Sequence, residues 1–339
     1  MRSERPARPT LTGVARRAGV SPSTVSRVVR GSTPVSAELE RTVREAIAAT
    51  GYVPNLAARQ LVTSRSDTIG VVIAEDQRHV FGEPFFADMI EGVTAELSTT
   101  PFRFILVVAR SRDDRMWLQH YVGSRHVDGV MLIAPERRDP LGRILQETGV
   151  PVVFMGRPFD VTGCRYVDAD NVGGTKQAVE YLHAKGRRHI AMITGIQTMR
   201  SGSDRLAGYR KGMEQVGLPI DERLIVASDY TEEGGELAMH DLLGRQVPID
   251  AVVAASDVSA VGALRALSTA RIAVPEEICV VGFGDDPNSA RHRPPLTTVA
   301  QPSVEMGRRL ARLMVDTIEG GKSRRRVVMP THLVVRETA

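Results

Sequence analysis

Hydrophobic residues in the first part of the chain recur at helical spacing. Three segments place them at i, i+3 and i+4: residues 11–18, 25–29 and 39–50. Gly19 supplies a turn between the first two segments. Ser21 and Ser36 stand where side-chain oxygens can cap the second and third helices. This pattern predicts a small bundle of three helices.

The second of these helices has an unusual outer face. Its valines form one stripe, so Pro22, Ser23, Ser26 and Arg27 lie outside that stripe. A generic bundle would carry Glu and Lys there, whereas small hydroxyl side chains with arginine are suited to base edges. Two helices joined by a tight glycine turn form a helix-turn-helix, whose second helix can enter the DNA major groove. We therefore predict a DNA-binding domain.

From residue 68 the pattern changes to short apolar runs that alternate with amphipathic stretches. The runs are TIGVVIA, RFILVVA, GVMLIA, VPVVFMG, HIAMITG, AVVAAS and ICVVGF. The helical stretches are 86–98, 113–124, 173–185, 206–216, 231–243 and 258–268. Continuous apolar strands that alternate with helices are typical of parallel sheets covered on both faces. The α/β pattern therefore predicts two doubly wound lobes.

Charge is distributed unevenly along the 339 residues. Residues 1–65 contain 11 Arg and 4 Glu with no Lys or Asp, a net charge of 11 − 4 = +7, whereas the whole chain has +4. The rest of the chain therefore carries 4 − 7 = −3. A net charge of +7 on so short a segment indicates a polyanion partner.

Several other function classes find no support in the sequence. No apolar run approaches the roughly 18 residues of a membrane helix, and no apolar stretch follows the charged N-terminus, so we expect a cytoplasmic protein with no membrane partner. Cys164 and Cys279 are far apart and lack metal-ligand spacing, which predicts buried thiols. GFGDDP lacks the third glycine of a dinucleotide site, and no nucleophile–base motif occurs. We expect no catalytic residue, no metal and no cofactor.

Candidate ligand contacts follow the predicted strands, because ligands of doubly wound lobes bind beyond the carboxyl ends of strands. The candidates at such positions are Arg157, Ser256, Asp257 and Asp285. Phe85 and Phe86 are adjacent rings in a chain with only 4% aromatic residues, so they are either core residues or a ligand platform. Arg205 opens a helical stretch and is either a surface residue or a ligand contact.

Two long segments, LTGVARRAGVSPSTVSRVVRG and VSAELERTVREAIAATGYVPNLAARQL, resemble the DNA-binding and hinge region of the lac repressor (LacI/GalR) family. The resemblance continues through PFFADMIEGV, DRLAGYRKGM, VVGFGDDP and HLVVRETA, and covers nearly the whole chain. It implies a periplasmic-binding-protein-like core that binds a small effector, sugar-like or related, between two lobes. It also implies a homodimer on a pseudopalindromic double-stranded operator.

The family resemblance also implies roles for single residues. On the DNA side, the base-reading positions are Pro22, Ser23 and Arg27, the supporting positions are Thr10, Thr24 and Ser26, and the hinge leucine is Leu61. Arg30 adds phosphate-binding capacity where relatives often have Asn, and Asn55 can cap the hinge helix. In the core, the effector positions are Phe85, Phe86, Arg205 and Asp257. Gly284 stands where many sugar-binding members have Asp, which leaves the effector's identity open.

These interpretations predict a transcriptional regulator, a repressor, whose operator affinity a metabolite controls. The alternatives with the same core are a solute-binding protein and a sugar-processing enzyme. The expected domains are a flexible basic arm over 1–9, a helix-turn-helix domain over 10–53, a hinge over 54–66 and a core over 67–339. Within the core, the expected first lobe is about 67–164 and 297–325, and the expected second lobe is about 165–296 and 326–339.

Overall fold

The computed structural model describes residues 9–30, 35–53, 65–74, 82–321 and 324–339, apart from the side chain of residue 30. The chain divides into two compact units, Met1–Ser66 and Asp67–Ala339. The sequence placed the start of the core at the same point. Each unit has apolar clusters of its own.

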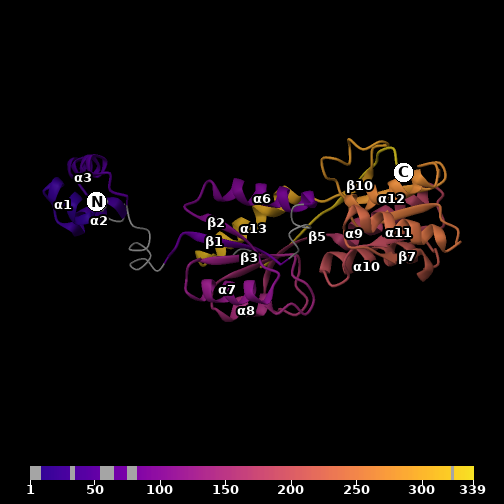
Figure 1. Ribbon diagram of the computed structural model, residues 1–339, viewed down its shortest axis with the longest axis horizontal. Coiled ribbons are helices and arrows are strands. Elements are labelled where there is room, and N and C mark those ends of the chain that lie inside the picture. Colours follow the sequence, from indigo (N-terminus) through magenta and orange to yellow (C-terminus); the bar gives the residue numbers. More distant parts are fainter. Residues whose placement is uncertain (1–8, 31–34, 54–64, 75–81, 322–323) are drawn as a thin grey trace, which may run out of the picture. The chain divides into compact units, whose positions relative to one another are not determined.

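The first unit contains the three predicted helices, α1 (Leu11–Ala18), α2 (Pro22–Arg30) and α3 (Ala37–Thr50) (Figure 1). Val14, Val25 and Val43 have no exposed surface and form the centre of its small core. Gly19 has a left-handed φ of 67°, which lets the chain turn sharply between α1 and α2. The hydroxyl of Ser36 accepts a hydrogen bond from the Leu39 N–H at 3.3 Å and caps α3, as predicted.

The second unit contains two six-stranded sheets. The first has the order β11-β5-β4-β3-β1-β2, and all of its strands are parallel. Its strands are β1 (Thr68–Ile73), β2 (Arg103–Val108), β3 (Gly129–Ile133), β4 (Val152–Met155), β5 (Arg165–Ala169) and β11 (Arg326–Met329). Helices α6 (Pro84–Leu97) and α13 (Ser303–Ile318) cover one face, and α7 (Arg112–Gly123) and α8 (Leu141–Glu147) cover the other (Figure 1). Each face has its own apolar cluster, as a doubly wound sheet requires.

The second sheet has the order β12-β10-β9-β8-β6-β7 and is parallel except for β12, which pairs antiparallel with β10. Its strands are β6 (Ile190–Thr194), β7 (Ile225–Ala227), β8 (Ala251–Ala254), β9 (Cys279–Gly284), β10 (Thr297–Ala300) and β12 (His332–Val334). Helices α9 (Asn171–Ala184) and α10 (Arg200–Gln215) pack on one face. Helices α11 (Glu232–Gly244) and α12 (Asp257–Thr269) pack on the other, and a 3₁₀ turn (Glu222–Leu224) precedes β7.

The predicted fold class is confirmed, but each predicted boundary between the lobes lies at the start of a strand, whereas the chain crosses after that strand. The strands at 165–169 and 326–329 belong to the first sheet, and the strand at 297–300 belongs to the second. The chain therefore crosses between the lobes after β5, after β10 and after β11. These three strands, RYVDA, TTVA and RVVM, contain polar residues, so no continuous apolar run marks their places in the sequence.

Both cysteines are buried free thiols, as predicted, and burial raises the pKa of each. Within the part of the chain that the structure describes, no helix has the length and apolar character needed to span a bilayer.

Helices α6 and α13 touch backbone to backbone. A Cβ on Gly92 would overlap the carbonyl oxygen of Val304, and a Cβ on Gly307 would overlap that of Met89. No side chain at these two positions could fit without moving one of the helices. The close approach lets both helices lie over the same apolar cluster.

We expect Gly92→Ala to lower the free energy of unfolding by about 1–3 kcal/mol, because the added methyl group forces the two helices apart. Urea denaturation of the full-length chain measures this. The matched control is Gly123→Ala at the end of α7, where a Cβ meets nothing within 4 Å and stability should be unchanged or slightly higher. Equal stability of the two variants would contradict the proposed close contact.

Candidate ligand pocket and nucleic-acid interface

The carboxyl ends of strands from both sheets face one cleft inside the core unit. Its lining includes residues that follow β3, β4 and β5 of the first sheet and residues that follow β8, β9 and β10 of the second. The open space, its mouth included, is about 1050 Å³. A cleft of this kind at strand ends is the usual ligand site of doubly wound sheets.

The cleft brings together six of the seven residues that the sequence proposed for the effector. They are Phe85, Phe86, Arg157, Arg205, Ser256 and Asp257. The two phenylalanine rings, at the start of α6, meet edge to face with centroids 5.4 Å apart. Phe86 is buried, whereas Phe85 is half-buried and is the ring with surface left for a ligand.

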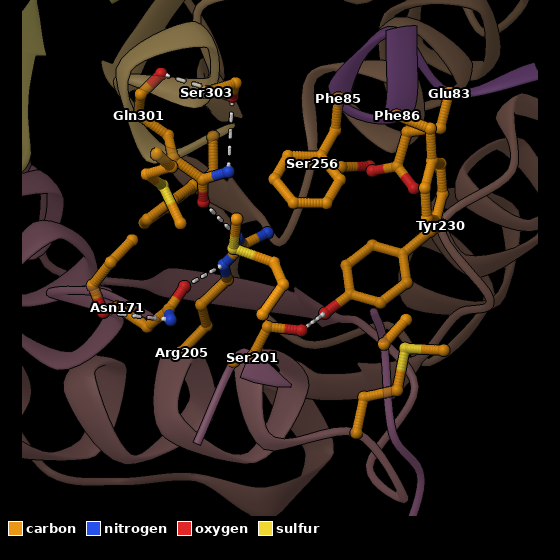
Figure 2. Close-up of a pocket in the computed structure, with 18 of the residues that line it drawn as sticks. Glu83, Phe85, Phe86, Asn171, Ser201, Arg205, Tyr230, Ser256, Gln301 and Ser303 are labelled. Carbon is orange, nitrogen blue, oxygen red and sulfur yellow. Dashed lines mark hydrogen bonds between the residues drawn. The ribbon is translucent and has the colours of Figure 1, made fainter. Parts of the chain in front are cut away.

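Arg205 is buried on α10 at the back of this cleft. Its Nε donates to Oδ1 of Asn171 at 2.8 Å, Nη1 to the carbonyl of Ala255 at 2.5 Å, and Nη2 to Oε1 of Gln301 at 2.9 Å. The guanidinium also lies 3.8 Å from the ring centroid of Phe283. Figure 2 shows the guanidinium held between the Asn171 and Gln301 side chains. The surface interpretation of this arginine is therefore wrong.

Asp257 lines the cleft, but its carboxylate is occupied by the protein. It accepts hydrogen bonds from the Thr298 hydroxyl at 2.5 Å, the Ser289 hydroxyl at 2.7 Å and the Asp286 N–H at 3.0 Å. Burial raises the pKa of Asp257, and these three hydrogen bonds act in the opposite direction. Its contacts make this carboxylate the support of the loop after β9 rather than an open acceptor.

Asp285 does not line the cleft, so its prediction as an effector contact is not supported by the geometry. Its φ is 57°, and its carboxylate accepts a hydrogen bond from Nη2 of Arg336 at 2.5 Å. The chain reverses at this residue, and the next residue, Asp286, lines the cleft instead. The rule that ligands bind beyond the carboxyl ends of strands cannot distinguish between two adjacent residues of a tight turn.

Several lining residues were not singled out from the sequence: Glu83, Asp88, Asn171, Ser201, Tyr230 and Gln301. Asn171 and Gln301 closely follow β5 and β10, so recognition of those two strands would have found them. The Tyr230 hydroxyl lies 3.1 Å from that of Ser201 (Figure 2). Burial raises the pKa of Asp88, and the negative charges of Glu91 and Asp286 raise it further.

Polar contacts also join the two lobes beside the cleft. Nη2 of Arg157, in the first lobe, lies 2.8 Å from a carboxylate oxygen of Asp204 on α10. The guanidinium of Arg200, also on α10, stacks 3.8 Å from the ring centroid of Phe159. Because these contacts bridge the lobes at residues that line the cleft or adjoin it, they favour the described arrangement of the lobes.

In the first unit, the start of α2 is organised by a hydroxyl cluster. The Ser21 oxygen accepts from the Thr24 N–H at 3.2 Å and lies 2.8 Å from both the Ser23 and Thr24 hydroxyls. Nη2 of Arg27 donates to the Thr24 hydroxyl at 3.3 Å. Pro22, Ser23 and Arg27 are exposed, whereas Thr24 is buried. The exposed residues remain candidates for base contact, and Thr24 supports Arg27 from below.

Other candidates of the DNA side differ in what the structure describes. The Thr10 hydroxyl accepts from the Gly13 N–H at 3.1 Å and so caps α1. Ser26 is half-buried on α2. The side chain of Arg30 and the whole of Asn55 and Leu61 lie outside the described residues.

The sequence matches known families in both units. Residues 10–55 match the bacterial regulatory proteins of the lacI family. Residues 179–339 match the periplasmic binding protein-like domain. The first match covers the helix-turn-helix, and the second covers most of the second lobe and the last strands.

Similar proteins extend the likeness to the full length. The HTH-type transcriptional regulator CelR of Thermobifida fusca is 45% identical over 99% of both chains, and the ribose operon repressor of Escherichia coli K12 is 35% identical over 88% of this chain and 89% of its own. Among solved structures, a CelR–cellobiose complex has a TM-score of 0.79 at 43% identity, covering 98% of this chain and all of the other. A lac repressor dimer bound to operator and the anti-inducer ONPF has a TM-score of 0.87 at 26% identity, covering 98% and 99%.

We expect Arg205→Met to lower the free energy of unfolding by about 1–3 kcal/mol or more, because it leaves buried acceptors without their donor. Arg210→Met on the same helix is the matched control. Among the described residues Arg210 forms a partly exposed ion pair with Glu222 at 2.8 Å and no other ion pair, so its loss should cost at most about 1 kcal/mol. Both values come from urea denaturation, and equal values would show that the Arg205 contacts are energetically unimportant.

Proposed function

Because this chain belongs to the LacI family of bacterial regulatory proteins, we propose that it is a homodimeric repressor whose operator affinity is set by a glucose disaccharide, cellobiose, in the core cleft. The observation that carries the proposal is the buried Arg205 at the back of the cleft, bonded to residues at two of the three crossings between the lobes. A ligand that contacts this network senses how the lobes are arranged.

The lining of the cleft suits a neutral sugar. A pyranose ring has apolar C–H faces and a rim of hydroxyls. Phe85 and Tyr230 offer aromatic faces that can pack against the C–H faces of the ring. Asp88, Arg157 and Ser201 offer acceptors and donors for its hydroxyls. Cellobiose is the ligand of the similar solved complex, which favours it over other disaccharides.

The helix-turn-helix unit supports operator binding. The first 65 residues carry the net positive charge of the chain, and α2 exposes Ser23 and Arg27. The relatives matched over most of their length are transcriptional regulators, which favours this interpretation over the solute-binding and enzyme alternatives. A regulator acts where its operator lies, so we place the working protein in the cytoplasm.

Control of DNA binding requires that the ligand prefer one arrangement of the lobes. The cleft provides for this, because Phe85 comes from α6 of the first lobe while Arg205 and Tyr230 belong to the second. A sugar that contacts Phe85 together with Arg205 and Tyr230 stabilises the arrangement of the lobes in which it can reach all three side chains at once. The homodimer, as in the solved lac repressor complex, would then present two such switches to one operator.

For the DNA contact, we expect Arg27→Ala to weaken binding to the specific operator by about 1–3 kcal/mol and binding to random DNA by less, because a guanidinium on base edges discriminates between sequences. Fluorescence anisotropy with both DNAs gives the two decreases in affinity. Arg44→Ala is the control, since Arg44 is held in an ion pair with Glu40 on α3. Equal decreases on both DNAs would assign Arg27 to phosphate alone.

For the effector, we expect calorimetry to detect cellobiose binding to the full-length protein, with ribose and maltose binding more weakly. Phe85→Ala should lower the cellobiose affinity about tenfold, or 1.4 kcal/mol, because the sugar loses its stacking surface. Val335→Ala, an exposed side chain outside the cleft lining, should leave the affinity unchanged. Tighter binding of another sugar would overturn the identity of the effector while leaving the regulator function intact.

A further inference from the structure

The amino-terminal edge of the first sheet, the side on which all of its parallel strands begin, is rich in arginine. All six strands of this sheet are parallel, so their amino-terminal ends lie along the same edge, opposite the ligand cleft. Arg103 begins β2, Arg165 begins β5 and Arg326 begins β11. Arg324 and Arg325 directly precede β11 on the same edge. Neither the effector cleft nor the helix-turn-helix uses any of these residues.

Three of these arginines are adjacent, exposed and held on an ordered backbone. The side chains of Arg324, Arg325 and Arg326 are exposed, and they form no ion pair with any residue that the structure describes. The carbonyl of Arg325 accepts a hydrogen bond from the Tyr166 N–H at 3.0 Å, which fixes the backbone beside β5. Three neighbouring positive charges without an acidic partner repel one another unless an anion lies between them.

Two acidic residues on this edge lie away from the arginine run. Asp67 and Asp128 adjoin β1 and β3, where the Asp67 N–H donates to the Asp128 carboxylate at 2.9 Å. In the strand order, β4 and β5 stand between β3 and β11. With neighbouring strands about 4.8 Å apart, the start of β11 is separated from that of β3 by three spacings, or about 14 Å. The positive charge of residues 324–326 is therefore not neutralised locally by this pair.

The connection of the chain indicates what kind of anion this edge meets. The segment from the helix-turn-helix unit enters the core at Asp67, directly before β1, and therefore at this same edge. The carbonyl of Asp67 accepts from the Arg103 N–H at 2.9 Å, which anchors the point of entry to β2. Among polyanions, operator DNA is the one to which the attached unit binds, and DNA carries about one negative charge per 1.7 Å of its axis.

We propose that Arg324, Arg325 and Arg326 contact the phosphate backbone of the operator as a second, sequence-independent DNA-binding surface on the core. This inference rests on the proposed DNA-binding function. A phosphate contact adds affinity for DNA of any sequence. The core would therefore increase the affinity for DNA, while α2 would determine the sequence specificity. The contact would also make operator affinity depend on the position of the first lobe.

The test is the full-length triple variant Arg324→Gln, Arg325→Gln and Arg326→Gln, measured by anisotropy with operator and random DNA at several salt concentrations. If each protomer of a dimer neutralises one phosphate fewer, the log–log salt slope should become shallower by about 2, at roughly 0.9 per phosphate. Affinity should fall about tenfold on both DNAs, with their ratio unchanged. The control removes the same charge from exposed arginines of the second lobe: Arg223→Gln, Arg271→Gln and Arg291→Gln. Equal losses of DNA affinity in the two triple variants would show that the net charge of the protein alone causes the loss, and would overturn the proposal.

Proximity is tested separately by placing a DNA-cleaving iron chelate on Arg325→Cys. Cys164 and Cys279 are buried, so the label goes to the new thiol. Cleavage of the bound operator from this position, and none from Arg291→Cys, supports the contact, whereas no cleavage from either position contradicts it. If the unmodified protein fails to bind any operator, the proposed function fails instead, and the two failures are thus distinguishable.

Discussion

Burial of the Arg205 guanidinium is a constraint on which the centre of the core depends. A charged group taken out of water must keep its hydrogen bonds, and here neutral acceptors supply them: the Asn171 amide, the Ala255 carbonyl and the Gln301 amide. Asn171 in turn donates to the buried carboxylate of Asp168 at 3.2 Å, at the end of β5. One positive charge thereby ties together the ends of three strands, and two of them lead into crossings between the lobes.

The same helix that carries Arg205 also carries the contacts that bridge the lobes. Arg200 and Asp204 lie within five residues of it on α10, and they meet Phe159 and Arg157 of the first lobe. The Arg157–Asp204 pair is partly exposed, with 45% and 17% of the two side chains accessible, so its contribution is about 0–1 kcal/mol. Moving a two-state equilibrium from 1:99 to 99:1 takes about 5.5 kcal/mol. These bridges can therefore shift the equilibrium between lobe arrangements only slightly, and a complete shift requires the binding energy of a ligand.

The sequence predicted what depends on a continuous local pattern and missed what depends on interrupted patterns or on residues distant along the chain. Long apolar runs and helix caps indicated seven strands, the helix-turn-helix and the α/β class, because burial on both faces of a sheet leaves a clear signature. β5, β10 and β11 contain polar residues that interrupt such a run, and missing these strands moved the lobe boundaries and concealed Asn171 and Gln301. The environment of Arg205 comes from residues 34 to 96 positions away along the chain, so only a family resemblance could point to it.

All strands of a parallel sheet begin on one side and end on the other, and in this core the two sides have different roles. The carboxyl ends of the strands form the ligand cleft, while the amino-terminal edge of the first sheet receives the chain from the helix-turn-helix unit. The central strands β3 and β4 are fully buried and closely packed, so a ligand cannot act by bending them. What remains free to change is the relation of the two lobes at their three crossings. A ligand that joins Phe85 to Tyr230 and the Arg205 network would fix that relation, and a first lobe that moved as a body would carry its arginine edge with it. Operator affinity would then respond to the sugar without any contact between the sugar and the DNA-linked edge.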